Sequence, residues 1–111
     1  MQDQGIESRV PHRHPLRTRG HLLFSGHGPV PVRTLDISVG GLCIVSELTL
    51  PAKIQGVIEL SLPAGNGRFE LQNINIQVMH SIFCNKEDGF KVGLLFLKPT
   101  LPLLKTIRAM Y

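Results

Sequence analysis

Short apolar runs separated by turn residues fill most of this chain. The runs end at Phe24, cover 30–37, 42–45 and 54–62, begin again at Phe69, and finally cover 90–96. Glycine or proline stands in most of the connections between them. Runs of this length with such boundaries are typical of the strands of an all-β sandwich or barrel, and not of alternating strands and helices.

The alternation within the runs indicates which face of each strand is buried. Ile58, Leu60 and Leu62 alternate with polar residues, and the run 90–96 alternates in the same way. Side chains point to opposite faces along a strand, so one face lies in a core and the other is wet. These strands therefore surround one core.

The long run after Phe69 changes parity. Phe69 and Leu71 share one parity, whereas Ile74, Ile76 and Val78 share the other. A change of this kind predicts a β-bulge near 72–73, which lets a strand bend around the corner of a barrel. We therefore expect a six-stranded antiparallel barrel.

A short helix is predicted at the C-terminal end. After Pro99 the apolar residues Leu103, Leu104 and Ile107 take helical spacing, and Thr100 is placed to cap the first turn. Residues 1–19 are polar and contain two prolines, which predicts a flexible arm. A chain of 111 residues suits a single domain, with the arm at 1–19 and the barrel and helix at 20–111.

Composition narrows the classes of function. A hydrophobic fraction of 42% with 18% charged residues indicates a folded protein, and the net charge of +4 favours an anionic partner. Aromatic residues make up only 5% and the lysines are dispersed, which argues against binding to long nucleic acid.

Several other classes lack their characteristic motifs. Cys43 and Cys84 are far apart, so reduced thiols are expected, with neither a disulfide framework nor a zinc ribbon. The histidines of the arm and first turn have no accompanying cysteine ligands, so no metal site is predicted. No run is long enough to insert into a membrane, which favours a cytoplasmic protein, and no nucleophile or paired-acid motif indicates an enzyme.

A D-x-S-x-x-G motif covers residues 36–41, where a strand ends and a turn begins. The Asp36 carboxylate can accept from the N–H groups of a guanine, and the Ser38 hydroxyl can donate or accept. Gly41 allows positive φ and a close approach of the backbone to a ring. Asp and Ser often cap turns and Gly-Gly is common in them, so the motif taken alone favours an ordinary Asx-turn.

Arginines concentrate upstream of this motif, with four of the seven in the first nineteen residues. Arg9 and Arg13 form an R-x-x-x-R motif, and Arg13 and Arg17 form a second that overlaps it. The planar guanidinium offers a fork of donors that fits phosphate and the acceptor edge of guanine.

An R-x-x-x-R arm, a β-hairpin, D-x-S-x-x-G, further strands and a short final helix together resemble the PilZ family. The segment 90–96 also resembles the family's aromatic-x-x-Gly-x-x-Phe strand. The resemblance implies a six-stranded antiparallel barrel that binds cyclic di-GMP, with the arginines on guanine and phosphate groups and the D-x-S-x-x-G segment beneath a guanine. The implied ligand residues are Arg9, Arg13, Asp36, Ser38, Gly40 and Gly41.

Two registers of the arginine motif stay open. Arg9 with Arg13 is preferred, because the residues after Arg13 then resemble the family's lead-in to the first strand, and Arg17 becomes a supporting charge. The alternative uses Arg13 with Arg17.

The resemblance implies a non-enzymatic receptor without a cofactor, which signals to a protein partner when its arm closes over the ligand. Motility, biofilm and exopolysaccharide control are the outputs that the family suggests, in a monomer or weak homodimer. The alternative function is a protein-interaction adaptor that does not bind nucleotide.

Overall fold

The computed structural model describes residues 12–110, which form seven strands and one helix. The strands are β1 (His14–Pro15), β2 (Arg19–Leu23), β3 (Val30–Ile37), β4 (Gly41–Ser46), β5 (Gln55–Gly65), β6 (Arg68–Cys84) and β7 (Gly89–Phe96), and the helix is α2 (Leu101–Arg108). The runs predicted from the sequence correspond to β2 through β7.

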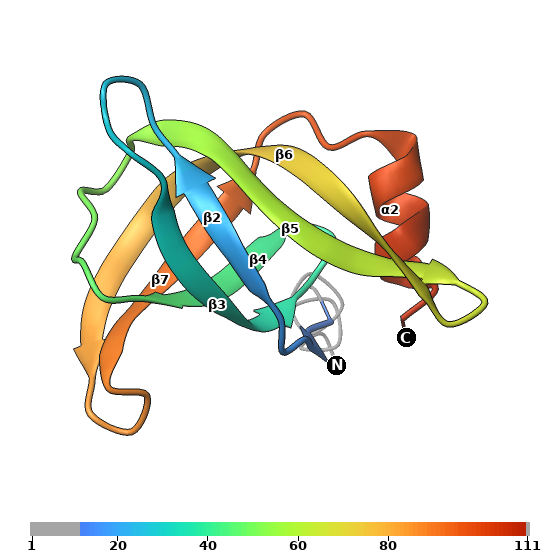
Figure 1. The fold of residues 1–111 in the computed structure, drawn as a ribbon, viewed down its shortest axis with the longest axis horizontal. Helices are drawn as coiled ribbons and strands as arrows, with labels where there is room; N and C mark the ends of the chain where they lie inside the picture. Colours follow the sequence, from blue (N-terminus) through green and yellow to red (C-terminus); the bar gives the residue numbers. More distant parts are fainter. Residues whose placement is uncertain (1–11, 111) are drawn as a thin grey trace, which may run out of the picture.

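Six of the strands close into an antiparallel barrel (Figure 1). Their order is β3-β2-β5-β6-β7-β4, and a pairing of β4 with β3 completes the circle. The short strand β1 pairs with the end of β3, next to the β2–β3 pairing. The predicted six-stranded antiparallel barrel with a C-terminal helix is confirmed. Closure leaves few free strand edges, which limits edge-to-edge association.

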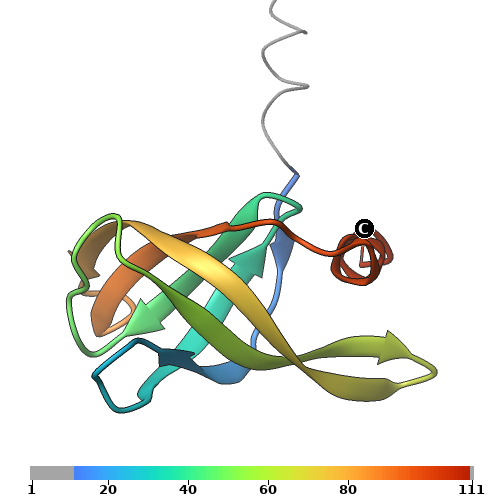
Figure 2. The ribbon, with the colours of Figure 1, turned by 90° about the horizontal axis from the view of Figure 1, so that it is seen from above.

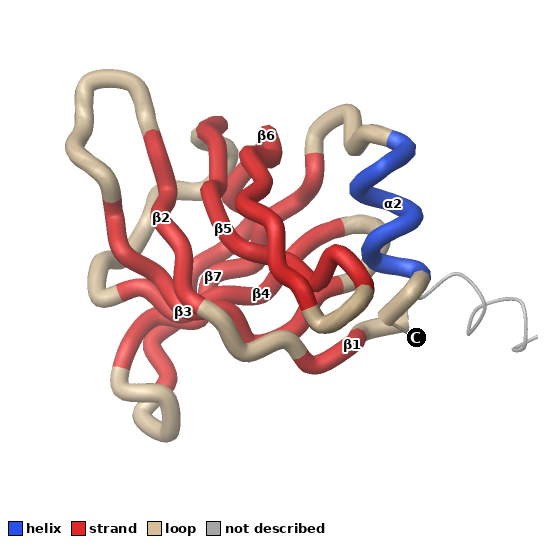
Figure 3. Tube along the Cα trace, turned by 45° about the vertical axis from the view of Figure 1, so that its right-hand side comes forward, coloured by secondary structure: helices blue, strands red, loops and turns tan. Residues whose placement is uncertain are grey.

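The hairpin of β5 and β6 extends beyond the barrel, and α2 lies beside it (Figures 1, 2 and 3). The side chain of Thr100 accepts a hydrogen bond from the Leu103 backbone nitrogen at 3.2 Å, as predicted for the N-cap. Leu103 and Ile107 are buried, which anchors the helix. Within residues 12–110, no helix has the length and apolar character needed to cross a membrane.

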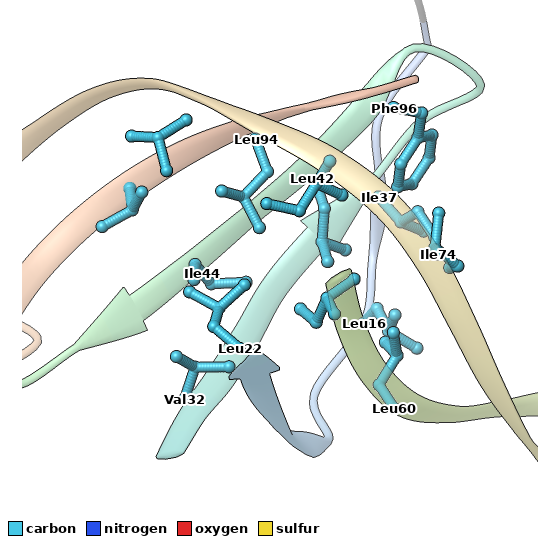
Figure 4. Close-up of a cluster of buried hydrophobic side chains, with 14 of the residues drawn as sticks. Leu16, Leu22, Val32, Ile37, Leu42, Ile44, Leu60, Ile74, Leu94 and Phe96 are labelled. Atoms are coloured by element: carbon cyan, nitrogen blue, oxygen red, sulfur yellow. The ribbon is translucent and has the colours of Figure 1, made fainter. Parts of the chain in front are cut away.

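The core is built from the inward faces of all six barrel strands (Figure 4). Side chains of Leu22, Ile44, Leu60 and Leu94 meet there and are almost completely excluded from solvent. Leu16, which precedes β2, joins this core, and its backbone nitrogen bonds to the Leu35 carbonyl oxygen at 3.0 Å. The part of the predicted arm from His14 onward is thus held on the barrel.

The bulge predicted near 72–73 is wrong. The pairing of β5 with β6 is regular there. Phe69 and Leu71 differ in parity from Ile74 because their side chains lie exposed on the outer face of the hairpin. The register of β6 shifts instead between Val78 and His80, in its pairing with β7. The parity change therefore marks two apolar side chains on the surface of the protruding hairpin.

Candidate functional site

The D-x-S-x-x-G segment forms the tight connection between β3 and β4. Ser38 and Gly41 exchange backbone hydrogen bonds of 2.9 and 3.4 Å, and the Ser38 Oγ accepts from the Gly40 nitrogen at 3.2 Å. Ser38 is only 3% exposed. Its hydroxyl therefore stabilises the turn, while the Asp36 side chain, 29% exposed, stays accessible from outside the barrel.

A β-bulge directs Asp36 outward. Thr34 pairs with Ile44 and is buried, but the register of β3 then shifts before Asp36, which pairs with Cys43. Ile37 again points into the core. Because side chains alternate along a strand, Asp36 would lie on the same face as buried Thr34 without this extra residue.

Arg13 and Asp36 form an ion pair, in which the Arg13 Nη1 donates to the Asp36 Oδ1. The pairing of β1 with β3 aligns His14 with Ile37 and Pro15 with Asp36, which brings the guanidinium to the carboxylate. Arg13 is 58% exposed. The structure thus brings together one residue from each predicted motif. Arg9 lies outside the described residues, so the choice of arginine register stays open.

Two glycines of the motif pack closely against β7. The Gly40 carbonyl oxygen accepts from the Phe96 nitrogen at 3.0 Å. A Cβ on Gly41 would lie 2.1 Å from the Leu94 carbonyl oxygen. Gly41 does not adopt positive φ, so that part of its sequence interpretation is wrong. A glycine is required there because two backbones approach each other closely.

A row of paired residues continues from Asp36 across the outer face of the barrel. Cys43 pairs with Asp36 and with Gly93, and Gly93 pairs with His80. The His80 ring lies directly on Gly93, where an added Cβ would be 2.2 Å from its Cε1. Burial, and then the charge of Asp36, raise the pKa of the Cys43 thiol, which is therefore neutral at pH 7. This row forms a surface beside the carboxylate.

Sequence reasoning did not place Cys43, Gly93 and His80 beside Asp36. Three different strand pairings join them, and these registers follow from the closed barrel. Gly93 was recognised only as part of the last-strand motif. His80 lies exposed because the register of β6 shifts after Val78.

Arg17, predicted as a supporting charge, lies with Arg33 beside Glu87 of the β6–β7 turn. The Arg33 Nη1 donates to the Glu87 Oε1 at 2.9 Å, and its Nη2 donates to the Glu87 carbonyl oxygen. The Arg17 Nη1 lies 3.8 Å from the same Oε1. No sequence signal indicated that Arg33 and Glu87 meet, because 54 positions separate them.

The contact between Arg33 and Glu87 should make the stability of the folded protein depend on pH. The hydrogen bond from Arg33, and then the charge of Arg17, lower the pKa of Glu87 from its ordinary value of 4.5. A carboxylate whose pKa is lower in the folded state contributes stability above its unfolded pKa and loses it as the pH falls through the folded one. The excess Tm of the wild type over Glu87→Gln should therefore shrink as the pH falls below about 4.5. Thermal unfolding followed by circular dichroism measures it, and a pH-independent difference would contradict this assignment.

Three features together define the class of this domain: a closed antiparallel barrel, a D-x-S-x-x-G turn, and an arginine paired with the aspartate of that turn. The chain matches the model of the PilZ domain over residues 7–111, and it belongs to this family. No curated protein matches it.

Two solved structures share the fold at 13% sequence identity. The inhibitor of motility MotI/DgrA from Bacillus subtilis superposes with a TM-score of 0.77 over 92% of this chain, which spans about half (49%) of that one. The PilZ domain of YcgR from Escherichia coli, with c-di-GMP, superposes with a TM-score of 0.67 and covers 90% of this chain and 86% of that one.

Among residues 12–110, no cluster of three or more His, Cys, Asp and Glu side chains has the arrangement of a metal site. Cys43 and Cys84 are both free thiols.

Proposed function

We propose that this chain is a non-enzymatic receptor for cyclic di-GMP that passes the level of this second messenger to a protein partner. The observation that carries the proposal is the Arg13–Asp36 pair beside the D-x-S-x-x-G turn. It places a fork of donors and a carboxylate acceptor together on the outer face of the barrel. Membership of the PilZ family and the fold shared with the ligand-bound YcgR domain support the same ligand.

The chemistry of the ligand fits this site. Cyclic di-GMP carries two phosphodiester charges and two guanines. Asp36 would accept from the N–H groups of one guanine, and Arg13 would donate to its acceptor edge or to a phosphate. Charge-assisted hydrogen bonds of this type are roughly twice as strong as neutral ones. Ser38, Gly40 and Gly41 would support the base by holding the turn in place.

The remaining parts of the proposal concern signalling. Arg9 would close over the ligand together with Arg13, and the surface so formed would be recognised by the partner. The similarity to the motility inhibitor favours motility as the output, with biofilm and exopolysaccharide control as related outputs. We place the protein in the cytoplasm, where the nucleotide would reach it, as a monomer or weak homodimer.

Calorimetric titration of the purified chain with cyclic di-GMP tests the proposal, with GTP and single-stranded DNA as controls. We expect saturable binding of cyclic di-GMP, weaker binding of GTP, and no saturable binding of DNA. Circular dichroism verifies that the chain is folded. A folded chain that does not bind cyclic di-GMP would reject the receptor and leave a protein-interaction adaptor as the best account.

A further inference from the structure

Three arginines surround a small pocket on the outer face of the barrel, next to the Arg13–Asp36 pair along β3. The pocket has a volume of about 220 Å³ and is lined by Arg17, Thr18, Arg19, Arg33 and Thr34. No acidic side chain lines it. We call it the arginine pocket.

Backbone pairing holds the arginines in place. Arg19 and Arg33 are direct partners across the β2–β3 ladder. Buried Thr34 fixes the preceding segment, because its Oγ1 accepts from the Thr18 nitrogen at 2.9 Å and its own nitrogen bonds to the Thr18 carbonyl oxygen at 2.8 Å. Arg17 and Arg19, on either side of Thr18, are thereby held at the rim. The backbone of the pocket is therefore fixed by the barrel, while the side chains of Arg17 and Arg33 are 67% and 43% exposed.

This arrangement is electrostatically unfavourable without an anion. Like charges directly opposite each other on neighbouring strands destabilise a sheet. Glu87 compensates part of the charge by contacting Arg33 and Arg17. Arg19 forms no ion pair with any described residue. Among the described residues Glu87 is the only carboxylate in an ion pair with these arginines, while Glu47 and Asp88 line a neighbouring pocket together with Arg19 and Arg33.

We infer that the arginine pocket binds a phosphate of the nucleotide and that Glu87 is an internal counterion which the phosphate displaces. This inference rests on the proposed function. Both arms of the Arg33 guanidinium are engaged by Glu87, one by Oε1 and one by the carbonyl oxygen. A phosphate oxygen can replace the Glu87 Oε1 on this guanidinium, while the backbone carbonyl oxygen of Glu87 keeps its own bond to Arg33.

The positions of Arg33 and Asp36 on β3 would let one ligand molecule contact both residues. Arg33 lies three positions before Asp36 on the same strand, a separation of roughly 10 Å at the rise of a β-strand. A dinucleotide whose guanine lies against Asp36 can therefore extend a phosphate towards Arg33. Arg13 and Arg17, four positions apart on the adjoining segment, would flank it.

Titration of cyclic di-GMP into wild type, Glu87→Gln and Arg33→Gln tests the inference. Glu87→Gln removes the internal competitor and should increase the affinity about fivefold. Arg33→Gln removes the guanidinium fork and should decrease the affinity about tenfold. Glu70→Gln, on the protruding hairpin, makes the same change in net charge as Glu87→Gln without an arginine contact, and should change the affinity less than about twofold. Tm values show that each variant is folded.

The outcomes separate the inference from the proposed function. If wild type binds but Glu87→Gln binds no more tightly than Glu70→Gln, Glu87 is not a competitor and the inference is overturned. Unchanged binding by Arg33→Gln would overturn it as well. In both cases the receptor function stands. If folded wild type does not bind cyclic di-GMP, the proposed function fails first and the inference fails with it.

Discussion

Replacing Asp36 with alanine is expected to lower the affinity for cyclic di-GMP by at least about tenfold, because a good bidentate contact to a base edge is worth about 1–3 kcal/mol. The direction of the change in affinity is informative, since the substitution removes a negative charge. If Asp36 acted only through long-range electrostatics, its removal would strengthen the binding of a dianion. A loss of affinity would therefore identify the carboxylate as a hydrogen-bond acceptor. Isothermal titration calorimetry measures it.

Two further variants test whether the geometry of the contact or only its charge determines the affinity. Arg13→Lys keeps the charge of its residue but loses the planar fork, so it should also bind weakly if geometry decides. Glu70→Ala removes a carboxylate on the protruding hairpin and should bind like wild type. Tighter binding by Asp36→Ala would contradict the proposed contact to guanine.

Replacing Gly41 with alanine is expected to destabilise the barrel by about 3 kcal/mol and to lower the Tm by more than about 10 °C. The new Cβ would lie 2.1 Å from the Leu94 carbonyl oxygen and 3.2 Å from the Leu94 carbonyl carbon. Both atoms belong to the backbone of β7, so the pairing between β4 and β7 must open. Thermal and urea unfolding measure the change.

Gly28→Ala is the control for this prediction. Gly28 has no heavy atom within 4 Å of an added Cβ. It is exposed and does not lie in the left-handed region. The substitution should change stability by less than about 0.5 kcal/mol. Equal Tm values for Gly41→Ala and Gly28→Ala would contradict the packing argument.

The bulges show where sequence reasoning reached its limit. The sequence does contain a signal for the bulge in β3, because Val30, Val32 and Thr34 share one parity and Ile37 has the other. The same kind of signal was interpreted near 72–73, where no bulge exists. A parity change arises either from an inserted residue or from apolar side chains on the surface, as with exposed Phe69 and Leu71. Only the pairing with a neighbouring strand distinguishes the two.

The sequence by itself determined what depends on local interactions. Alternating apolar residues and Gly or Pro turns defined the strands, and Thr100 defined the start of the helix, because these features depend on neighbours a few positions away. The two motifs also identified Arg13 and Asp36 as candidates, although not the contact between them.

The tertiary structure decided which distant residues share a surface. Asp36 pairs with Cys43, and His80 joins the same row through Gly93, only because of the registers of a closed barrel. Glu87 reaches Arg33 across 54 positions of the chain. Such contacts depend on how strands pair and where bulges shift their registers, and the side-chain period of two makes each shift move a residue between core and surface. No local pattern encodes that choice, so the outer face of the barrel emerged only from the fold.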